Sequence, residues 1–256
     1  MNTRTRDDMN QALAKVPQVT LAFWIVKVFA TTLGETGGDA VSMSMNLGYL
    51  VATGIFATFF LLAVAAQIRA RDYHPALYWA TIIASTTVGT TLADFFDRSL
   101  GIGYAGGSSI LLALLLASLW LWKRTTGTVS VESVASPRTE LFYWVTIMFS
   151  QTLGTALGDW TADTAGLGYT GGALVFSALL GGVALAYFRT RVSRTALFWA
   201  AFILTRPLGA VVGDFLDKPV DAGGLALSRY AATVVLLAFI AGSLWLLPQR
   251  AACKSH

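Results

Sequence analysis

Residues 23–39 read FWIVKVFATTLGETGGD, and the same arrangement returns three more times along the chain. Each copy starts with an aromatic residue and a tryptophan, has a glycine ten residues after the tryptophan, and reaches an aspartate fifteen residues after it. The tryptophans are Trp24, Trp79, Trp144 and Trp199, and the aspartates are Asp39, Asp94, Asp159 and Asp214. No copy needs a gap, so this spacing indicates four tandem copies of one structural unit.

Each copy continues beyond its aspartate with a glycine-rich turn and a second apolar run that ends in basic residues. The turn contains a Gly-Tyr pair in the first three copies, and the fourth has no such pair after Asp214. The copies span residues 19–71, 74–124, 139–191 and 194–250, with an N-terminal segment 1–18, a linker 125–138 and a tail 251–256. The linker divides the chain into two halves of two copies each.

The four tryptophans and the four Gly-x-x-x-Gly/Ala-Asp blocks resemble a bacterial membrane-protein family. That family is defined by a four-fold repeat of unknown function and is usually labelled uncharacterized membrane-anchored protein. The resemblance covers nearly the whole chain and implies two transmembrane segments per repeat. It brings no established substrate with it.

The composition also indicates a membrane protein. Of 256 residues, 55% are hydrophobic and only 12% are charged, whereas a soluble domain carries about 25% charged residues. Eight apolar runs are each close to the roughly 20 residues that cross a bilayer. They cover residues 19–39, 47–68, 76–94, 103–122, 141–159, 168–188, 196–214 and 225–247. The sequence therefore predicts an all-α transmembrane bundle of about eight helices, in four two-helix repeats of parallel orientation.

The basic residues predict how the bundle is oriented. Of the 18 Lys and Arg residues, thirteen lie in the termini and between repeats, and only Arg98, Lys218 and Arg229 lie in the corners within repeats. Cytoplasmic loops carry the excess of basic residues, so both termini should be cytoplasmic in a bacterial inner (plasma) membrane. All four repeats then insert in the same direction, which predicts a pseudo-rotation axis along the membrane normal. The basic groups are too scattered for a nucleic-acid site.

A polar stripe leads to each aspartate in steps of four residues, which share one helix face. The stripes are Lys27, Thr31, Glu35 and Asp39; Thr86, Thr90 and Asp94; Gln151, Thr155 and Asp159; and Arg206, Ala210 and Asp214. Ionisable groups inside a membrane usually face the bundle interior or a water-filled cavity. We therefore expect the stripes to line a common axial cavity, with carboxylates near its outer end.

The candidate substrate-binding or ion-binding residues come from these stripes. They are Asp39, Asp94, Asp159, Asp214, Glu35, Thr31, Thr90, Gln151, Thr155 and Arg206, and the four aspartates are also candidate metal ligands. Asp39 and Asp159 should matter most, because their repeats keep both the Gly-Asp pair and the Gly-Tyr turn. Arg206 should pair with Glu35 or Asp39. In the alternative, structural reading, the aspartates cap the next turn or pair with Arg206, Lys27, Arg98 or Lys218.

Three other features have structural interpretations. The small-x-x-x-small pairs, such as Gly34 and Gly38, should let helices approach closely. The four tryptophans are interpreted as an aromatic belt at the membrane interface. Lys27 should extend its long side chain to that interface.

The leading functional hypothesis is a small secondary transporter or exporter of a cation, coupled to protons. Carboxylate and hydroxyl oxygens suit hard ions such as Mg, Ca or Mn, and the helices offer no thiol or imidazole. The alternative is a non-transporting membrane scaffold or sensor that binds a partner or a lipid. We expect no enzyme activity and no cofactor, because no Ser-His pair or nucleotide loop is present. An oligomer is compatible with either function.

The orientation can be tested by labelling. Cysteines introduced at Ser99 and Thr164 should react with an impermeant thiol reagent in intact cells, and Cys253 should not. Reaction of Cys253 from outside would contradict the orientation.

Overall fold

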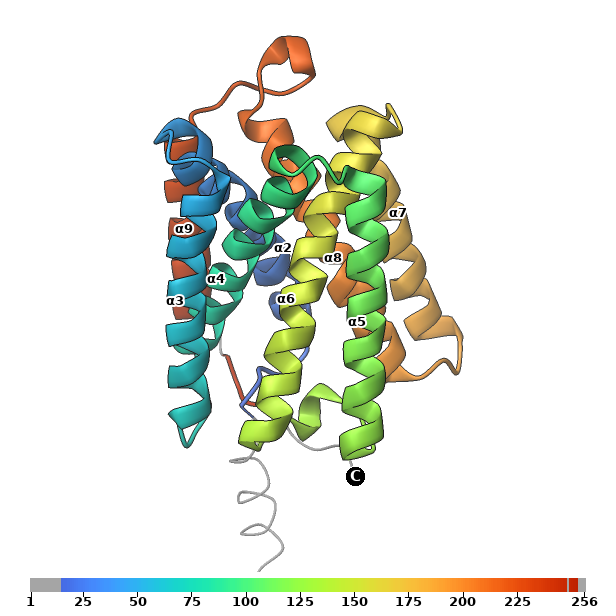
Figure 1. Ribbon diagram of the computed structural model, residues 1–256. Helices are drawn as coiled ribbons and strands as arrows, with labels where there is room; N and C mark the ends of the chain where they lie inside the picture. Colours follow the sequence, from blue (N-terminus) through green and yellow to red (C-terminus); the bar gives the residue numbers. More distant parts are fainter. Residues whose placement is uncertain (1–14, 248, 253–256) are drawn as a thin grey trace, which may run out of the picture.

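Eight long helices run side by side in the described part of the chain (Figure 1). The computed structural model describes residues 15–247 and 249–252, so Cys253 lies outside the described residues. The helices are α2 (Leu21–Asp39), α3 (Tyr49–Arg69), α4 (Pro75–Asp94), α5 (Tyr104–Thr126), α6 (Pro137–Asp159), α7 (Gly168–Arg189), α8 (Arg194–Asp217) and α9 (Arg229–Leu246). They confirm the predicted all-α bundle of four two-helix repeats.

The aspartate of each of the first three repeats lies where an α-helix changes into a π-helical turn. These turns are η1 (Ala40–Ser44), η2 (Phe95–Ser99) and η4 (Trp160–Thr164). In the fourth repeat α8 continues to Asp217, and the 3-10 turn η5 (Val220–Ala222) follows. A further 3-10 turn, η3 (Val131–Ser133), lies in the linker. We call the end of the bundle with the aspartates the corner end, and the opposite end the terminal end.

The helices form two concentric layers. In the inner ring α2 packs on α4, α4 on α6, α6 on α8, and α8 closes the ring on α2. Each outer helix packs on the first helix of the following repeat: α3 on α4, α5 on α6, α7 on α8, and α9 on α2. This closed order is the arrangement of four parallel repeats that the sequence predicts.

Glycines set the separation within the inner ring. The glycine ten residues after each tryptophan lies against a side chain of the next repeat. The pairs are Gly34 with Thr86, Gly89 with Gln151, Gly154 with Arg206, and Gly209 with Thr31. A Cβ atom on Gly89 would lie only 2.9 Å from the backbone carbon of Gln151. The predicted packing role of the glycines is confirmed.

The outer layer has the surface of a membrane protein. Five helices are long and apolar enough to cross a bilayer, namely the four outer helices α3, α5, α7 and α9 and the inner helix α8. Large apolar side chains of the outer helices, such as Phe59, Trp120 and Phe188, are exposed. The inner helices α2, α4 and α6 are less apolar because they carry polar stripes, and the ring turns these stripes away from the bundle surface.

The tryptophans that begin the repeats do not form the expected interfacial belt. Trp79, Trp144 and Trp199 are buried, and each contacts the aromatic residue of the preceding repeat. The ring centroids are 5.5 Å apart for Phe23 and Trp79, 5.8 Å for Tyr78 and Trp144, 6.2 Å for Tyr143 and Trp199, and 5.7 Å for Phe198 and Trp24. The aromatic residues thus close a ring of their own near the terminal end.

Segments outside the repeats meet at the terminal end. Lys15 Nζ lies 2.7 Å from Glu140 Oε1. The Gln18 amide donates to the Arg250 carbonyl at 2.9 Å, and Trp199 Nε1 donates to the Val129 carbonyl at 2.9 Å. Residues 15–18, the linker and residues 249–252 therefore pack on the bundle next to the aromatic ring.

The close approach of the inner helices can be tested at Gly89. Gly89→Ala should lower the stability by about 1–3 kcal/mol, because the added Cβ meets backbone atoms that cannot move aside. The thermal unfolding midpoint in detergent measures this change.

Gly181→Ala on α7 is the matched control, since a Cβ there meets nothing within 4 Å. Alanine favours a helix over glycine, so this variant should be at least as stable as the parent. Equal midpoints for the Gly89 and Gly181 variants would contradict the packing role.

Candidate functional site

The four polar stripes meet along the axis of the inner ring. Position seven after the tryptophan holds Thr31, Thr86, Gln151 and Arg206; position eleven holds Glu35, Thr90, Thr155 and Ala210; position fifteen holds the four aspartates. All of these residues are buried, with exposed fractions of 3% or less. The predicted convergence is confirmed. The sequence predicts that these side chains line an open cavity. In the structure they instead pack against and bond to one another.

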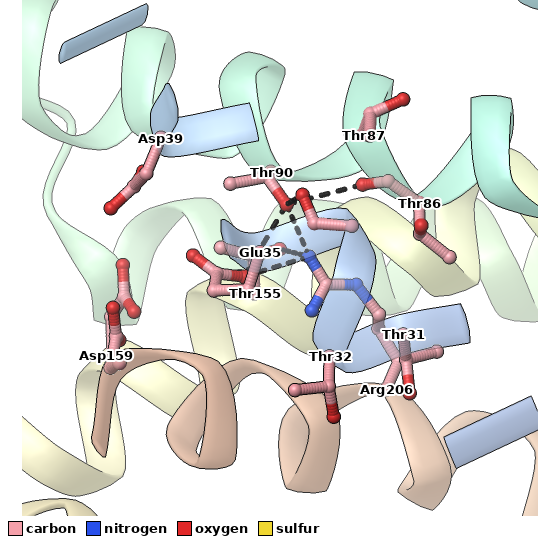
Figure 2. A network of polar contacts seen from close by, with 12 residues as sticks. Thr31, Thr32, Glu35, Asp39, Thr86, Thr87, Thr90, Thr155, Asp159 and Arg206 are labelled. Carbon is pink, nitrogen blue, oxygen red and sulfur yellow. Dashed lines mark hydrogen bonds and ion pairs between the residues drawn. The ribbon is translucent and has the colours of Figure 1, made fainter. Parts of the chain in front are cut away.

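Arg206 connects all four inner helices. Its Nη2 atom lies 3.0 Å from Glu35 Oε2 on α2 and 2.6 Å from Thr90 Oγ1 on α4, and it also donates to Thr155 Oγ1 on α6 (Figure 2). The expected ion pair with Glu35 is confirmed. Arg206 Nε and Nη1 have no hydrogen-bond partner within the described part of the chain. The Nη2 atom of Arg206 therefore links the residues that stand eleven positions after the tryptophan in the first three repeats.

Two of the candidate residues, Thr31 and Gln151, lie nearer to the terminal end than the carboxylates do. The Thr31 hydroxyl donates to the Thr205 carbonyl at 3.1 Å, and Gln151 Nε2 donates to Ser85 Oγ at 3.4 Å. Both residues also pack on glycines of the neighbouring repeat. Their contacts are those of helix packing, and the structure does not bring them to the aspartates.

Two cations bridge the four aspartates in pairs. Arg98 Nε lies 2.9 Å from Asp94 Oδ1, and Arg98 Nη2 lies 3.2 Å from Asp159 Oδ2. Lys218 Nζ lies 2.5 Å from Asp39 Oδ2 and 3.0 Å from Asp214 Oδ1. Each cation thus joins the aspartate of its own repeat to that of the next.

The two bridges follow a two-fold pattern within the four-fold ring. Arg98 and Lys218 both stand nineteen residues after their tryptophans, and repeats one and three carry Met43 and Asp163 there.

The ion pairs match the structural alternative for the aspartates. The capping alternative is not found, because Asp39, Asp94 and Asp159 make no side-chain cap bond to the turns that follow.

One side of the ring has a third carboxylate. Glu35, Asp39 and Asp214 each offer an oxygen atom, and these atoms all lie within 4.8 Å of one another. The other aspartate pair has no such addition, since Thr90 and Thr155 stand at the position of Glu35. Asp39 Oδ1 is buried and has no hydrogen-bond partner among the described residues. This group is the part of the site that could hold a metal ion.

The central network carries more negative than positive charge. It contains six carboxylates, those of Glu35, Asp217 and the four aspartates, and four cations, those of Arg98, Arg206, Lys218 and Arg229. Two negative charges are left without a full counter-charge when every group is ionised. Unpaired charge is costly in a buried site, so the network favours the uptake of protons or a cation.

The fourth repeat keeps its tyrosine after a longer corner. The tyrosine that opens the outer helix follows the aspartate by ten residues in the first three repeats, as in Tyr49 and Tyr104, and by sixteen in Tyr230. Arg229 takes the place of the preceding glycine, and its Nε atom lies 2.7 Å from Asp217 Oδ2. In the sequence the Arg229-Tyr230 pair marks the start of this outer helix, but a search for Gly-Tyr pairs does not find it.

Two buried charged residues, Lys27 and Asp97, form no ion pair within the part of the chain that the structure describes. Lys27 is fully buried instead of reaching the interface, with Nζ 4.1 Å from the centroid of the Phe202 ring. Asp97, in η2 beyond the end of α4, is 7% exposed, and neither carboxylate oxygen has a hydrogen-bond partner among the described residues. Burial raises the pKa of Asp97 to about 6, although the nearby Arg98 opposes this shift.

Comparison with known proteins supports the repeat assignment. The family described as Repeat of Unknown Function (DUF347) matches residues 22–73, 77–128, 142–193 and 197–250. These segments cover most of the chain and coincide with the four repeats. No curated protein and no solved structure gave a match.

The Arg206–Glu35 pair can be tested with a double-mutant cycle. Arg206→Met should lower the free energy of unfolding by about 3–5 kcal/mol, because it leaves the Glu35 carboxylate buried without its counter-charge. Glu35→Gln combined with Arg206→Met should cost less than Arg206→Met alone. Denaturant titration in detergent measures Arg206→Met, Glu35→Gln and the double variant, and additive losses would show that the two residues act independently.

Proposed function

We propose that this chain, which belongs to the DUF347 repeat family, exchanges a small divalent cation for protons across a bacterial inner (plasma) membrane. The observation that carries the proposal is the buried group of Glu35, Asp39 and Asp214, in a network with two more negative than positive charges. Ionisable groups inside a membrane are costly and usually mark ion or proton pathways.

The ligand set favours a hard divalent ion. Carboxylate oxygens bind Ca²⁺ at about 2.3–2.6 Å, and Mg²⁺ at about 2.0–2.1 Å. Oxygens on opposite sides of a Ca²⁺ ion are thus separated by about 4.6–5.2 Å. The oxygen atoms of the group all lie within 4.8 Å of one another, which is close enough for one such ion to contact all three. Imidazole and thiol ligands are not part of the group, which disfavours softer metals.

Lys218 is suited to compete with the bound ion. Its ammonium group contacts both Asp39 and Asp214, where a metal ion would bind. A lysine carries a compact charge on a flexible stem, whereas the planar arginine fork holds a carboxylate in a fixed geometry. We therefore assign cation exchange to the Lys218 side of the ring and a structural role to the Arg98 side. This assignment favours Asp39 and Asp214 over the pair Asp39 and Asp159 that the sequence alone suggests.

The charge balance supports coupling to protons. Two excess negative charges are neutralised equally by one divalent ion or by two protons. Either loaded form keeps the buried network close to neutral, and an empty, fully ionised form does not. An exchanger of this kind moves between its two loaded forms and avoids the costly empty one.

The orientation follows from the basic residues. Their excess at the terminal end supports a cytoplasmic location for that end, which would bring the carboxylates near the outer surface. The Arg206 layer and the aromatic ring lie between the carboxylates and the cytoplasm. Alternating access would require both layers to separate.

A non-transporting scaffold or sensor is the second candidate. It is favoured by the ion pairs that engage every aspartate of the ring and by the burial of the whole network. In that case the charges only hold the repeats together, and the protein binds a partner or a lipid at its surface.

Flux in proteoliposomes distinguishes the two functions. With an imposed pH gradient, the parent protein should move Mn²⁺, Ca²⁺ or Mg²⁺, with proton movement in the opposite direction. Asp39→Asn and Glu35→Gln should each lower this flux at least tenfold, because they remove charge from the three-carboxylate group.

Asp221→Asn is the matched control. It removes the same charge from an exposed corner residue outside the ring, so it should transport like the parent. A parent protein that moves none of these ions would favour the scaffold, as would ring variants that transport normally.

A further inference from the structure

The repeats allow Asp97 to be compared with an equivalent residue in the same chain. Asp97 and Asp217 both stand eighteen residues after the tryptophans of their repeats. Both are buried, with the same exposed fraction of 7%. Asp217 has a cation, because Arg229 Nε lies 2.7 Å from its Oδ2 atom. Asp97 has none, and both of its oxygens lack a hydrogen-bond partner in residues 15–247 and 249–252.

In the second repeat a glycine stands in the place of the arginine that pairs with Asp217 in the fourth repeat. Arg229 directly precedes Tyr230 at the start of α9, and Gly103 directly precedes Tyr104 at the start of α5. A Cβ atom on Gly103 would meet nothing within 4 Å. The space from which an arginine side chain would extend is therefore open in the second repeat. The Asp97 carboxylate lies against Gly107, one turn further along α5.

The other charged groups of this corner are already engaged. Arg98 bonds to Asp94 and Asp159, and the Tyr104 hydroxyl donates to Asp163 at 3.4 Å. With a pKa of about 6, the Asp97 carboxylate is mostly ionised at neutral pH. A buried carboxylate without a partner is costly, which leaves Asp97 as an acceptor ready for a basic group.

We propose that Asp97 binds the basic group of an external ligand, a primary ammonium or a guanidinium, in the place that Arg229 occupies in the fourth repeat. Arg229 also lies 3.7 Å from Asp39 and donates to Ser44 Oγ at 3.3 Å. The equivalent residues around Asp97 are Asp159 and Thr164, which should complete the ligand's surroundings. This site is distinct from the three-carboxylate group and does not depend on the proposed transport.

Two sources can supply such a group. One is the ammonium headgroup of a phospholipid such as phosphatidylethanolamine, because the predicted topology brings this corner to the bilayer surface. The other is a free amine or guanidine in the outer solution. Both present a hydrogen-bonding cation to a carboxylate, so the experiment must separate them.

The experiment titrates the delipidated full chain in detergent with three probes: short-chain phosphatidylethanolamine, the phosphatidylcholine with the same chains, and methylguanidinium chloride. The thermal unfolding midpoint reports binding. The ethanolamine lipid alone should raise the midpoint if the ligand is a lipid, and methylguanidinium should raise it if the ligand is a free cation. Phosphatidylcholine should have a smaller effect, because its headgroup has no N–H donor.

Asp97→Asn should weaken the effective probe at least about tenfold, the loss of one hydrogen bond to a charged group. Asp221→Asn, which removes an exposed carboxylate of another corner, should respond like the parent. If Asp97→Asn does not fold, the comparison of the two lipids and methylguanidinium on the parent still decides. No preference among the probes, or an equal response of folded Asp97→Asn, would overturn the proposal.

Discussion

The close contact between the glycine of one repeat and the side chain seven residues after the next tryptophan determines the rest of the structure. It occurs four times and closes α2, α4, α6 and α8 into a ring. Once the ring is closed at this distance, every polar stripe faces the axis. The apolar membrane then offers the charged groups no solvent, so they must satisfy one another inside the ring.

The charges break the symmetry that the backbone keeps. Within the stripes, a glutamate appears only in the first repeat and an arginine only in the fourth, while the bridging cations come from the second and fourth repeats. The same helical frame therefore carries a three-carboxylate group next to a lysine on one side. On the other side, two carboxylates are held by an arginine. Chemical function in this ring depends on these differences, because the shared residues alone would make four equal sites.

The sequence predicted what depends on periodicity and failed where three-dimensional packing decides. Fixed spacing predicted the eight helices and the common axis, and the place of Arg206 inside an apolar helix predicted that it pairs with Glu35 or Asp39. The buried tryptophans were missed, although they lie on the same helix face as the stripes, because tryptophan is also common at membrane interfaces. Lys27 was placed at the interface for its length, whereas its position on that face buries it. The direct packing of the stripes on one another could not be predicted, since it depends on which neighbour each glycine meets.

Proton release on metal binding tests the account most directly. In weakly buffered detergent solution, Mn²⁺ should bind to the purified protein and release protons, about two per ion at a pH where the network is protonated. This proton release should be lost when Glu35 is replaced by Gln and Asp39 by Asn together. Manganese binding without proton release, or release that is unchanged in this double variant, would contradict cation–proton exchange at the three-carboxylate group.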